Sequence, residues 1–222
     1  MTDAAFPPLS HGELRGLFAE LPETPVILRA FDYTRERMPP VLFNHVTRSW
    51  IFAAKLGAKR GERFDAEVVA VTTLLHDLGF TAHGDGPNRF EVNGAAIAAA
   101  FVRDLGFDDR RVQLVWDGIA LHATHSISLF KETEVALSAR GIGVDFGTPD
   151  YATLDPAEIA AVVAAVPRLD MKRAFAACAL HQAETRPETT YENFIRDFGE
   201  RFVPGYAPPS WVDAIAGGPF EE

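Results

Sequence analysis

The sequence has little cysteine, no long apolar run and no excess of basic residues, and each shortage excludes a class of protein. Its 222 residues contain one cysteine, Cys178, so an internal disulfide framework is excluded. No window approaches the ~18 uninterrupted apolar residues of a membrane span. The first residues, MTDAAFPPLSHGEL, lack the basic and apolar regions of a signal peptide. We therefore expect a soluble, cytoplasmic protein with no membrane partner.

The charge balance is acidic. The chain has 21 Lys and Arg residues against 31 Asp and Glu residues, which gives a formal net charge of −10. A nucleic-acid binder needs basic surface to neutralise phosphates, so this balance argues against a nucleic-acid partner. The content of 47% hydrophobic and 23% charged residues is that of a globular protein. We expect a small-molecule substrate, and a homodimer is compatible with the sequence.

Cap residues and helix breakers predict a run of helices, with no alternating strand pattern between them. Ser10 with Glu13 has the spacing of a capping box, Asp65 caps an apolar stretch, and Gly61 follows another as a stop. We expect irregular chain at 80–89 and 141–153. The expected helices cover residues 11–21, 24–37, 41–60, 66–78, 90–105, 109–125, 129–139, 156–166, 169–185 and 190–202, with a short turn at 211–215.

These elements predict an all-α fold, a multi-helix bundle in which residues 1–222 form a single domain. The core is expected at about 40–180, with the N-terminal helices of 10–37 and the C-terminal helices of 169–215 packed on it.

One pair of side chains at the end of an apolar helix stands out. His76 and Asp77 follow the stretch TTLL and precede a glycine. A buried, unpaired carboxylate is unfavourable by several kcal/mol, so an aspartate on an apolar face needs a cation, a metal or a capping role. Taken alone, the pair also fits a solvated carboxylate beside a core histidine.

Two further residues complete a candidate ligand set. His45 lies in the middle of a predicted helix, where Leu42, Ser49 and Phe52 share its inward face. Asp145 is an acid in the apolar stretch GIGVDFG. Each alone is typical of a structural residue, but together with the His-Asp pair they provide two imidazoles and two carboxylates. That set suits a transition metal held between helices.

In their order along the chain these residues resemble the HD metallohydrolase superfamily. The stretches FNHVTRSW, LLHDLG, RFEVNGA and IALH are most similar to its cyanamide hydratase-like branch. The resemblance implies an HD-type bundle with a central site, in which one divalent metal, zinc or iron, is bound by the four residues named above: His45, His76, Asp77 and Asp145.

Positions at which this sequence differs from other HD branches disfavour two of the activities found in the superfamily. Many HD phosphohydrolases carry a phosphate-facing lysine where this sequence has Phe80, so a phosphodiesterase is disfavoured. Di-metal HD oxygenases have a histidine near the position of Asn93, and its absence disfavours a two-metal site.

Other residues are candidates for the surroundings of the metal. His122 is expected to face inward, as a proton-transferring residue, an extra ligand or a core histidine. Asp77 is a second candidate for proton transfer. Residues expected near a substrate pocket are Asn44, Arg48, Phe80, His83, His125 and Phe130.

We therefore predict a metal-dependent enzyme that hydrates or hydrolyses a small uncharged molecule, and the resemblance implies a nitrile-type substrate such as cyanamide. The main alternative is an HD-type phosphohydrolase acting on a nucleotide or phosphomonoester, with Arg48, Arg89 and Lys131 as the cations of its pocket. An HD-type iron oxygenase and a metal-free binding module are the remaining hypotheses.

Overall fold

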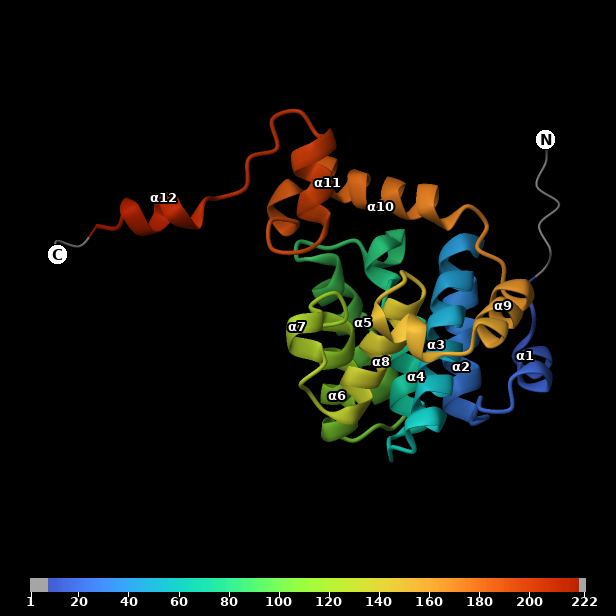
Figure 1. Cartoon of the computed structure of the whole chain (residues 1–222). Coiled ribbons are helices and arrows are strands. Elements are labelled where there is room, and N and C mark those ends of the chain that lie inside the picture. Colours follow the sequence, from blue (N-terminus) through green and yellow to red (C-terminus); the bar gives the residue numbers. More distant parts are fainter. Residues whose placement is uncertain (1–7, 220–222) are drawn as a thin grey trace. The chain divides into compact units, whose positions relative to one another are not determined.

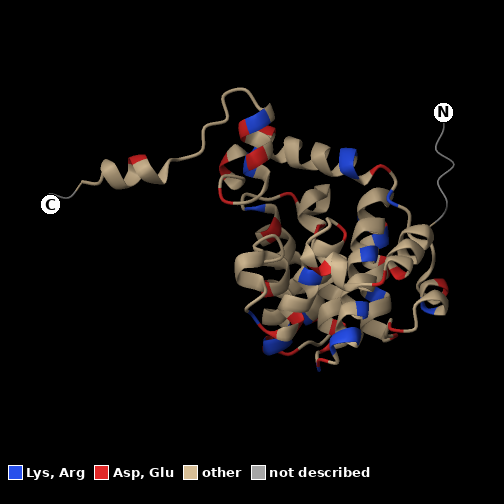
Figure 2. Ribbon diagram, in the orientation of Figure 1, with Lys and Arg blue, Asp and Glu red and all other residues tan. Residues whose placement is uncertain are grey.

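A computed structural model describes residues 8–219 of the chain, and within them every regular element is helical (Figure 1). The all-α prediction is confirmed. The chain divides into two compact units, Met1–Met171 and Lys172–Glu222. Each is described separately below. Acidic and basic residues are interspersed along the helices of both units (Figure 2).

From residue 8 onward, unit 1 contains nine α-helices joined by turns and short 3-10 segments. The α-helices are α1 (His11–Leu17), α2 (Pro25–Arg37), α3 (Pro40–Arg60), α4 (Ala66–Leu75), α5 (Phe90–Asp104), α6 (Asp109–Ala120), α7 (His125–Ser128), α8 (Thr133–Val144) and α9 (Pro156–Ala165). The 3-10 segments are η1 (Leu78–Phe80), η2 (Ala82–Gly84) and η3 (Pro149–Thr153).

The predicted caps set the ends of several of these helices. Ser10 and Glu13 form the capping box of α1. The carboxylate of Asp65 accepts hydrogen bonds from the backbone amides of Glu67 and Val68 at the start of α4. Gly61 ends α3 with a φ of 63°, a left-handed conformation that glycine adopts without strain.

The long helix α3 lies at the centre of unit 1. Its residues from Leu42 to Gly57 are all buried, which a helix achieves only when neighbours cover every face. Helices α4 and α8 pack against it, and α5 packs against α6 (Figure 1). The metal-ligand candidates on α3 and α4 therefore lie in the interior of the unit.

Several predicted helices have different bounds in the structure; α1 ends at Leu17 and α4 at Leu75, before the expected ends at residues 21 and 78. The helix expected at 129–139 is α8, which begins at Thr133 and continues through the glycines to Val144. The stretch from 141 to 144 is therefore not irregular. A Cβ at Gly141 would lie 2.5 Å from the Cβ of Ala53, so this glycine allows α8 to approach α3. The helix expected at 109–125 ends at Ala120, and α7 follows as a separate short helix.

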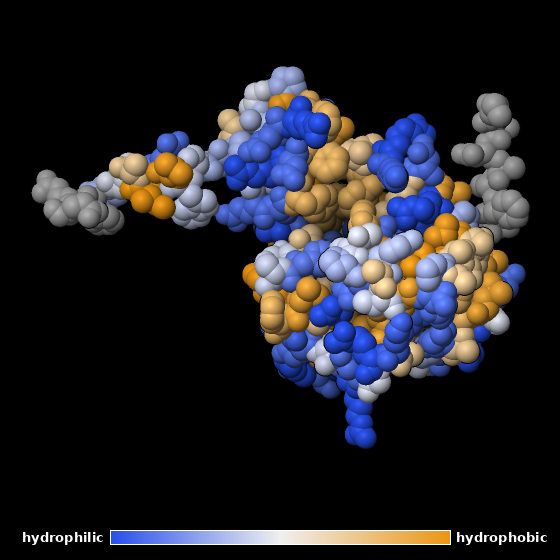
Figure 3. All heavy atoms as spheres, viewed as in Figure 1, coloured by the Kyte–Doolittle hydropathy of each residue, from blue (hydrophilic) through white to orange (hydrophobic). Residues whose placement is uncertain are grey.

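Unit 2 holds most of α10 (Met171–Thr185), η4 (Pro187–Thr189), α11 (Ile195–Phe202) and α12 (Trp211–Ala216). The helix expected at 190–202 is shorter in the structure, because α11 begins at Ile195. The side chains of Trp211, Val212 and Ile215 on α12 are exposed, and Figure 3 shows this helix carrying orange, apolar atoms. Among residues 8–219, no helix has the length and apolarity to span a membrane.

Candidate metal centre

Three of the four predicted ligands meet in the interior of unit 1. His45 lies on α3, whereas His76 and Asp77 directly follow α4. All three side chains are at most 1% exposed. One ligand atom from each lies within 4.8 Å of the other two. Nε2 of His45 is 3.2 Å from Nε2 of His76, and Oδ2 of Asp77 is 3.5 Å and 3.4 Å from these two nitrogens.

Hydrogen bonds on the far side of each ring define which nitrogen carries the proton. Nδ1 of His45 is 2.7 Å from the carboxylate of Asp145, and Nδ1 of His76 is 2.8 Å from the carbonyl oxygen of Thr73. Both partners only accept, so both Nδ1 atoms donate. Burial lowers the pKa of His45, so its ring is neutral at pH 7. Nε2 of His45 then carries a lone pair and lies beside Nε2 of His76.

Asp77 is the part of the cluster that lacks partners. Both of its carboxylate oxygens are buried and accept no hydrogen bond within residues 8–219. Burial acts to raise its pKa, but the neighbouring imidazoles, His76 foremost, lower the pKa to about 2. Both oxygens of this ionised carboxylate are thus left for a cation lying between Asp77 and the two imidazoles. Two imidazole nitrogens and a carboxylate are donors that fit a divalent transition metal.

Asp145, the fourth predicted ligand, lies on the other side of His45. Its Oδ2 accepts from Nδ1 of His45, while Arg48 donates from Nε at 2.8 Å and from Nη2 at 2.7 Å. Arg168 donates a further bond of 2.6 Å to Oδ1. Burial opposes ionisation, but these donors, with Arg48 first, hold the pKa of Asp145 well below its usual range. In this structure Asp145 orients the imidazole of His45 and does not face the cluster.

His122 faces the cluster from a different element. It follows α6, is 5% exposed, and its ring centroid is 4.8 Å from that of His76. Nδ1 lies 2.7 Å from the carbonyl oxygen of Ile119, to which it donates, so Nε2 carries the lone pair. Burial lowers the pKa of His122 to about 3, so the ring is a neutral proton acceptor at pH 7. The expected inward orientation of His122 is confirmed.

The predicted pocket residues are distributed over several elements of unit 1. Phe80 stacks on Phe90 with centroids 3.9 Å apart. His83 is bonded to the hydroxyl of Tyr33 at 2.8 Å. His125 begins α7, so it does not share a helix with His122 as the spacing predicts. Phe130 is 87% exposed.

The two pocket candidates on α3 make contacts with the chain that follows α9. Asn44 donates from Nδ2 to the carbonyl oxygen of Pro167 at 2.9 Å. Arg48 donates from Nη1 to the carbonyl oxygens of Val166 and Pro167 at 3.2 Å and 3.1 Å, in addition to binding Asp145. Arg48 is thus a buried structural cation. The sequence gives no signal for the carbonyl oxygens or for Arg168. Backbone acceptors are present at every residue, and Arg168 lies in irregular chain after α9, where no periodic pattern defines the position of a side chain.

A comparison with known protein families gives a match, and it covers the segment that holds the cluster. Residues 42–144 match the HD domain family, and this range includes the three clustered ligands. The match covers 103 of the 222 residues, so the comparison shows a similarity of this segment to HD domains. Proteins with HD domains are generally metal-dependent hydrolases, which agrees with the donors at this site. A search of curated proteins gave no match to the chain. Membership of the cyanamide hydratase-like branch therefore remains a prediction.

Proposed function

We propose that this protein uses a divalent metal at His45, His76 and Asp77 to add water to a small uncharged substrate, of which a nitrile such as cyanamide is the leading example. The observation that carries the proposal is the buried carboxylate of Asp77, which lies 3.5 Å and 3.4 Å from the Nε2 atoms of His45 and His76 and accepts no hydrogen bond within residues 8–219. A bound divalent metal would lower the pKa of a water molecule toward about 7 and so supply a nucleophile.

The chain's own residues would move the protons. Hydration forms a bond between the water oxygen and the nitrile carbon, and the water protons must reach the nitrile nitrogen to give an amide. His122 is the residue suited to this transfer, because its neutral ring has a lone pair on Nε2 and packs against the ring of His76. Asp145 would keep the lone pair of His45 directed at the metal by holding the proton on Nδ1.

The ion pairs of the structure favour an uncharged substrate over a phosphate. A phosphohydrolase needs cations that face its substrate. Each of the three cations proposed for that role already faces an acidic side chain: Arg48 contacts Asp145, Arg89 contacts Glu91, and Lys131 contacts Asp117. Phe80, in the position of the phosphohydrolase lysine, lies against Phe90. These contacts support the small neutral substrate predicted from the sequence.

The test is turnover by the full chain after loading with zinc or iron. We expect cyanamide or a small nitrile to be converted to the corresponding urea or amide, detected by chromatography. Turnover of a nucleotide or phosphomonoester panel, with none of the nitriles, would overturn the proposal.

Two variants separate binding from proton transfer. His122→Phe keeps an aromatic ring against His76, so we expect metal affinity within about threefold of the parent and a rate lower by about 10²–10⁴. His83→Phe is the matched control, because His83 contacts Tyr33 outside the cluster. Equal rates for both variants would remove His122 from the mechanism.

A further inference from the structure

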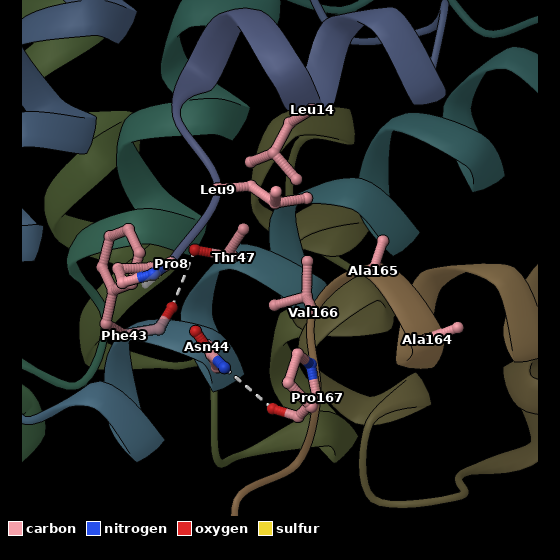
Figure 4. Close-up of a pocket in the computed structure, with 10 residues that line it drawn as sticks. All are labelled: Pro8, Leu9, Leu14, Phe43, Asn44, Thr47, Ala164, Ala165, Val166 and Pro167. Carbon is pink, nitrogen blue, oxygen red and sulfur yellow. Dashed lines mark hydrogen bonds between the residues drawn. The ribbon is translucent and has the colours of Figure 1, made fainter. Parts of the chain in front are cut away.

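A cavity lies in unit 1 away from the metal cluster, and none of the clustered ligands lines it. It has a volume of about 230 Å³ and is enclosed by the start of α1, by α3 and by the end of α9 (Figure 4). Its ten lining residues are uncharged, so it suits a neutral occupant. Apolar side chains form most of the wall, among them Leu9, Leu14, Phe43 and Val166.

One polar group in this wall lacks a partner. Asn44 is 5% exposed, and its Nδ2 donates to the carbonyl oxygen of Pro167. That bond defines the orientation of the amide, because a carbonyl accepts and cannot donate. The amide oxygen of Asn44 receives no hydrogen bond within residues 8–219, and in Figure 4 it points away from Pro167. This oxygen is therefore an acceptor open to the cavity, and a ligand that donates would hydrogen-bond to it.

The rest of the cavity also lacks donors. The hydroxyl of Thr47 donates to the carbonyl oxygen of Phe43 and is therefore engaged within α3 (Figure 4). Helix α9 ends at Ala165, and Ala164 and Ala165 line the cavity. The last carbonyl groups of a helix have no intrahelical donors and carry its negative partial charge. The polar groups of this cavity therefore accept hydrogen bonds, and the remainder is apolar.

We propose that this cavity binds a small neutral molecule with an apolar body and one hydrogen-bond-donating end, such as an alcohol or a phenol, with the donor directed at Oδ1 of Asn44. The volume agrees with this class, since an apolar cavity of about 150 Å³ holds benzene. A cavity of 230 Å³ accommodates an aromatic ring and one short polar substituent. This binding site is independent of the proposed hydration activity.

The probe for the test is benzyl alcohol, with toluene and benzyl methyl ether as matched compounds that cannot donate. Each is titrated into the full chain, and ¹H–¹⁵N spectra report the shifts of the backbone amides at 43–47 and 164–166. We expect benzyl alcohol to give saturable shifts there and to bind about fivefold more tightly than the other two compounds. Absence of saturable shifts, or equal affinity for all three, would overturn the proposal.

Variants place the binding within the cavity. Ala165→Leu adds volume to the wall while leaving Asn44 intact, and we expect it to weaken benzyl alcohol binding at least tenfold. Ala161→Leu is the control on the same helix, because Ala161 is exposed and does not line the cavity. Asn44→Ala should bring benzyl alcohol to the affinity of toluene. If Ala165→Leu bound benzyl alcohol as the parent does, the site would lie elsewhere and the assignment would fail.

Discussion

Replacement of Arg48 by methionine is the most informative test of how the interior of unit 1 is held together. Arg48 has no exposed surface and donates two hydrogen bonds to Asp145. It also donates to the carbonyl oxygens of Val166 and Pro167. Methionine is unbranched and apolar, like the methylene stem of arginine, but it has no hydrogen-bond donor. Asp145 would keep His45 and Arg168 as partners, while Val166 would lose the arginine as its donor.

The expected size of the effect follows from burial. Removal of one partner from a buried ion pair destabilises a protein by about 3–5 kcal/mol, because the remaining charge stays in a medium of low polarity. Single domains have a free energy of unfolding of about 5–15 kcal/mol, so Arg48→Met should remove a large share of it. Arg60→Met is the matched control on the same helix. Arg60 pairs with Glu62 at the surface, where such pairs contribute at most about 1 kcal/mol.

The assay is urea-induced unfolding of the metal-free chain, followed by circular dichroism and tryptophan fluorescence, with the free energy obtained by linear extrapolation. We expect Arg48→Met to lose at least ~2 kcal/mol more than Arg60→Met. Equal losses for the two variants would refute the view that Arg48 is a buried structural cation.

Three further predictions follow from particular contacts. Asp77→Asn should lower zinc affinity at least ~100-fold in a competition titration, because it removes the only carboxylate among the three clustered donors; unchanged zinc affinity would contradict the site. Burial lowers the pKa of His11 below 6.5, so the unfolded chain binds the proton more readily than the folded chain. The free energy of unfolding should therefore fall as the pH drops below 6.5. His11→Phe should weaken this pH dependence in urea midpoints measured from pH 7.5 to 5. Gly141→Ala should destabilise the protein by about 1–3 kcal/mol in the same assay, because the added Cβ would overlap Ala53, and a neutral effect would show that α8 shifts without penalty.

The residues that could be predicted from the sequence are those whose position on a helix decides their surroundings. His45, His76 and Asp77 lie on or next to apolar stretches, which favour an inward position, although the pattern also fits a solvated Asp77. The caps at Ser10 and Asp65 are equally local, because a cap is defined by residues two or three positions away. All five positions agree with the structure.

The parts that could not be predicted depend on contacts between distant segments. The glycines of GIGV indicate irregular chain when only their neighbours are considered, but Gly141 adjoins Ala53, almost ninety residues earlier, and helix packing requires its small size. Asp145 was expected to face the metal because the family resemblance implies it. Its position against His45, Arg48 and Arg168 depends on how α3, α8 and the chain after α9 meet. A pattern of neighbouring residues cannot predict contacts between segments so far apart in the sequence.

The histidines at the ends of α4 and α6 have a consequence for how the site tolerates change. His76 and His122 each donate Nδ1–H to the carbonyl oxygen three residues earlier, that of Thr73 and that of Ile119. The acceptor is backbone in both cases, so substitution of either earlier residue leaves it in place. The orientation of each ring is therefore defined within four consecutive residues and does not depend on side chains elsewhere in the chain. His45 differs, since its orientation depends on the side chain of Asp145, one hundred residues away. Substitutions elsewhere in the chain should therefore alter the orientation of His45 on α3 first. The imidazoles of His76 and His122 should keep their orientation when neighbouring side chains change.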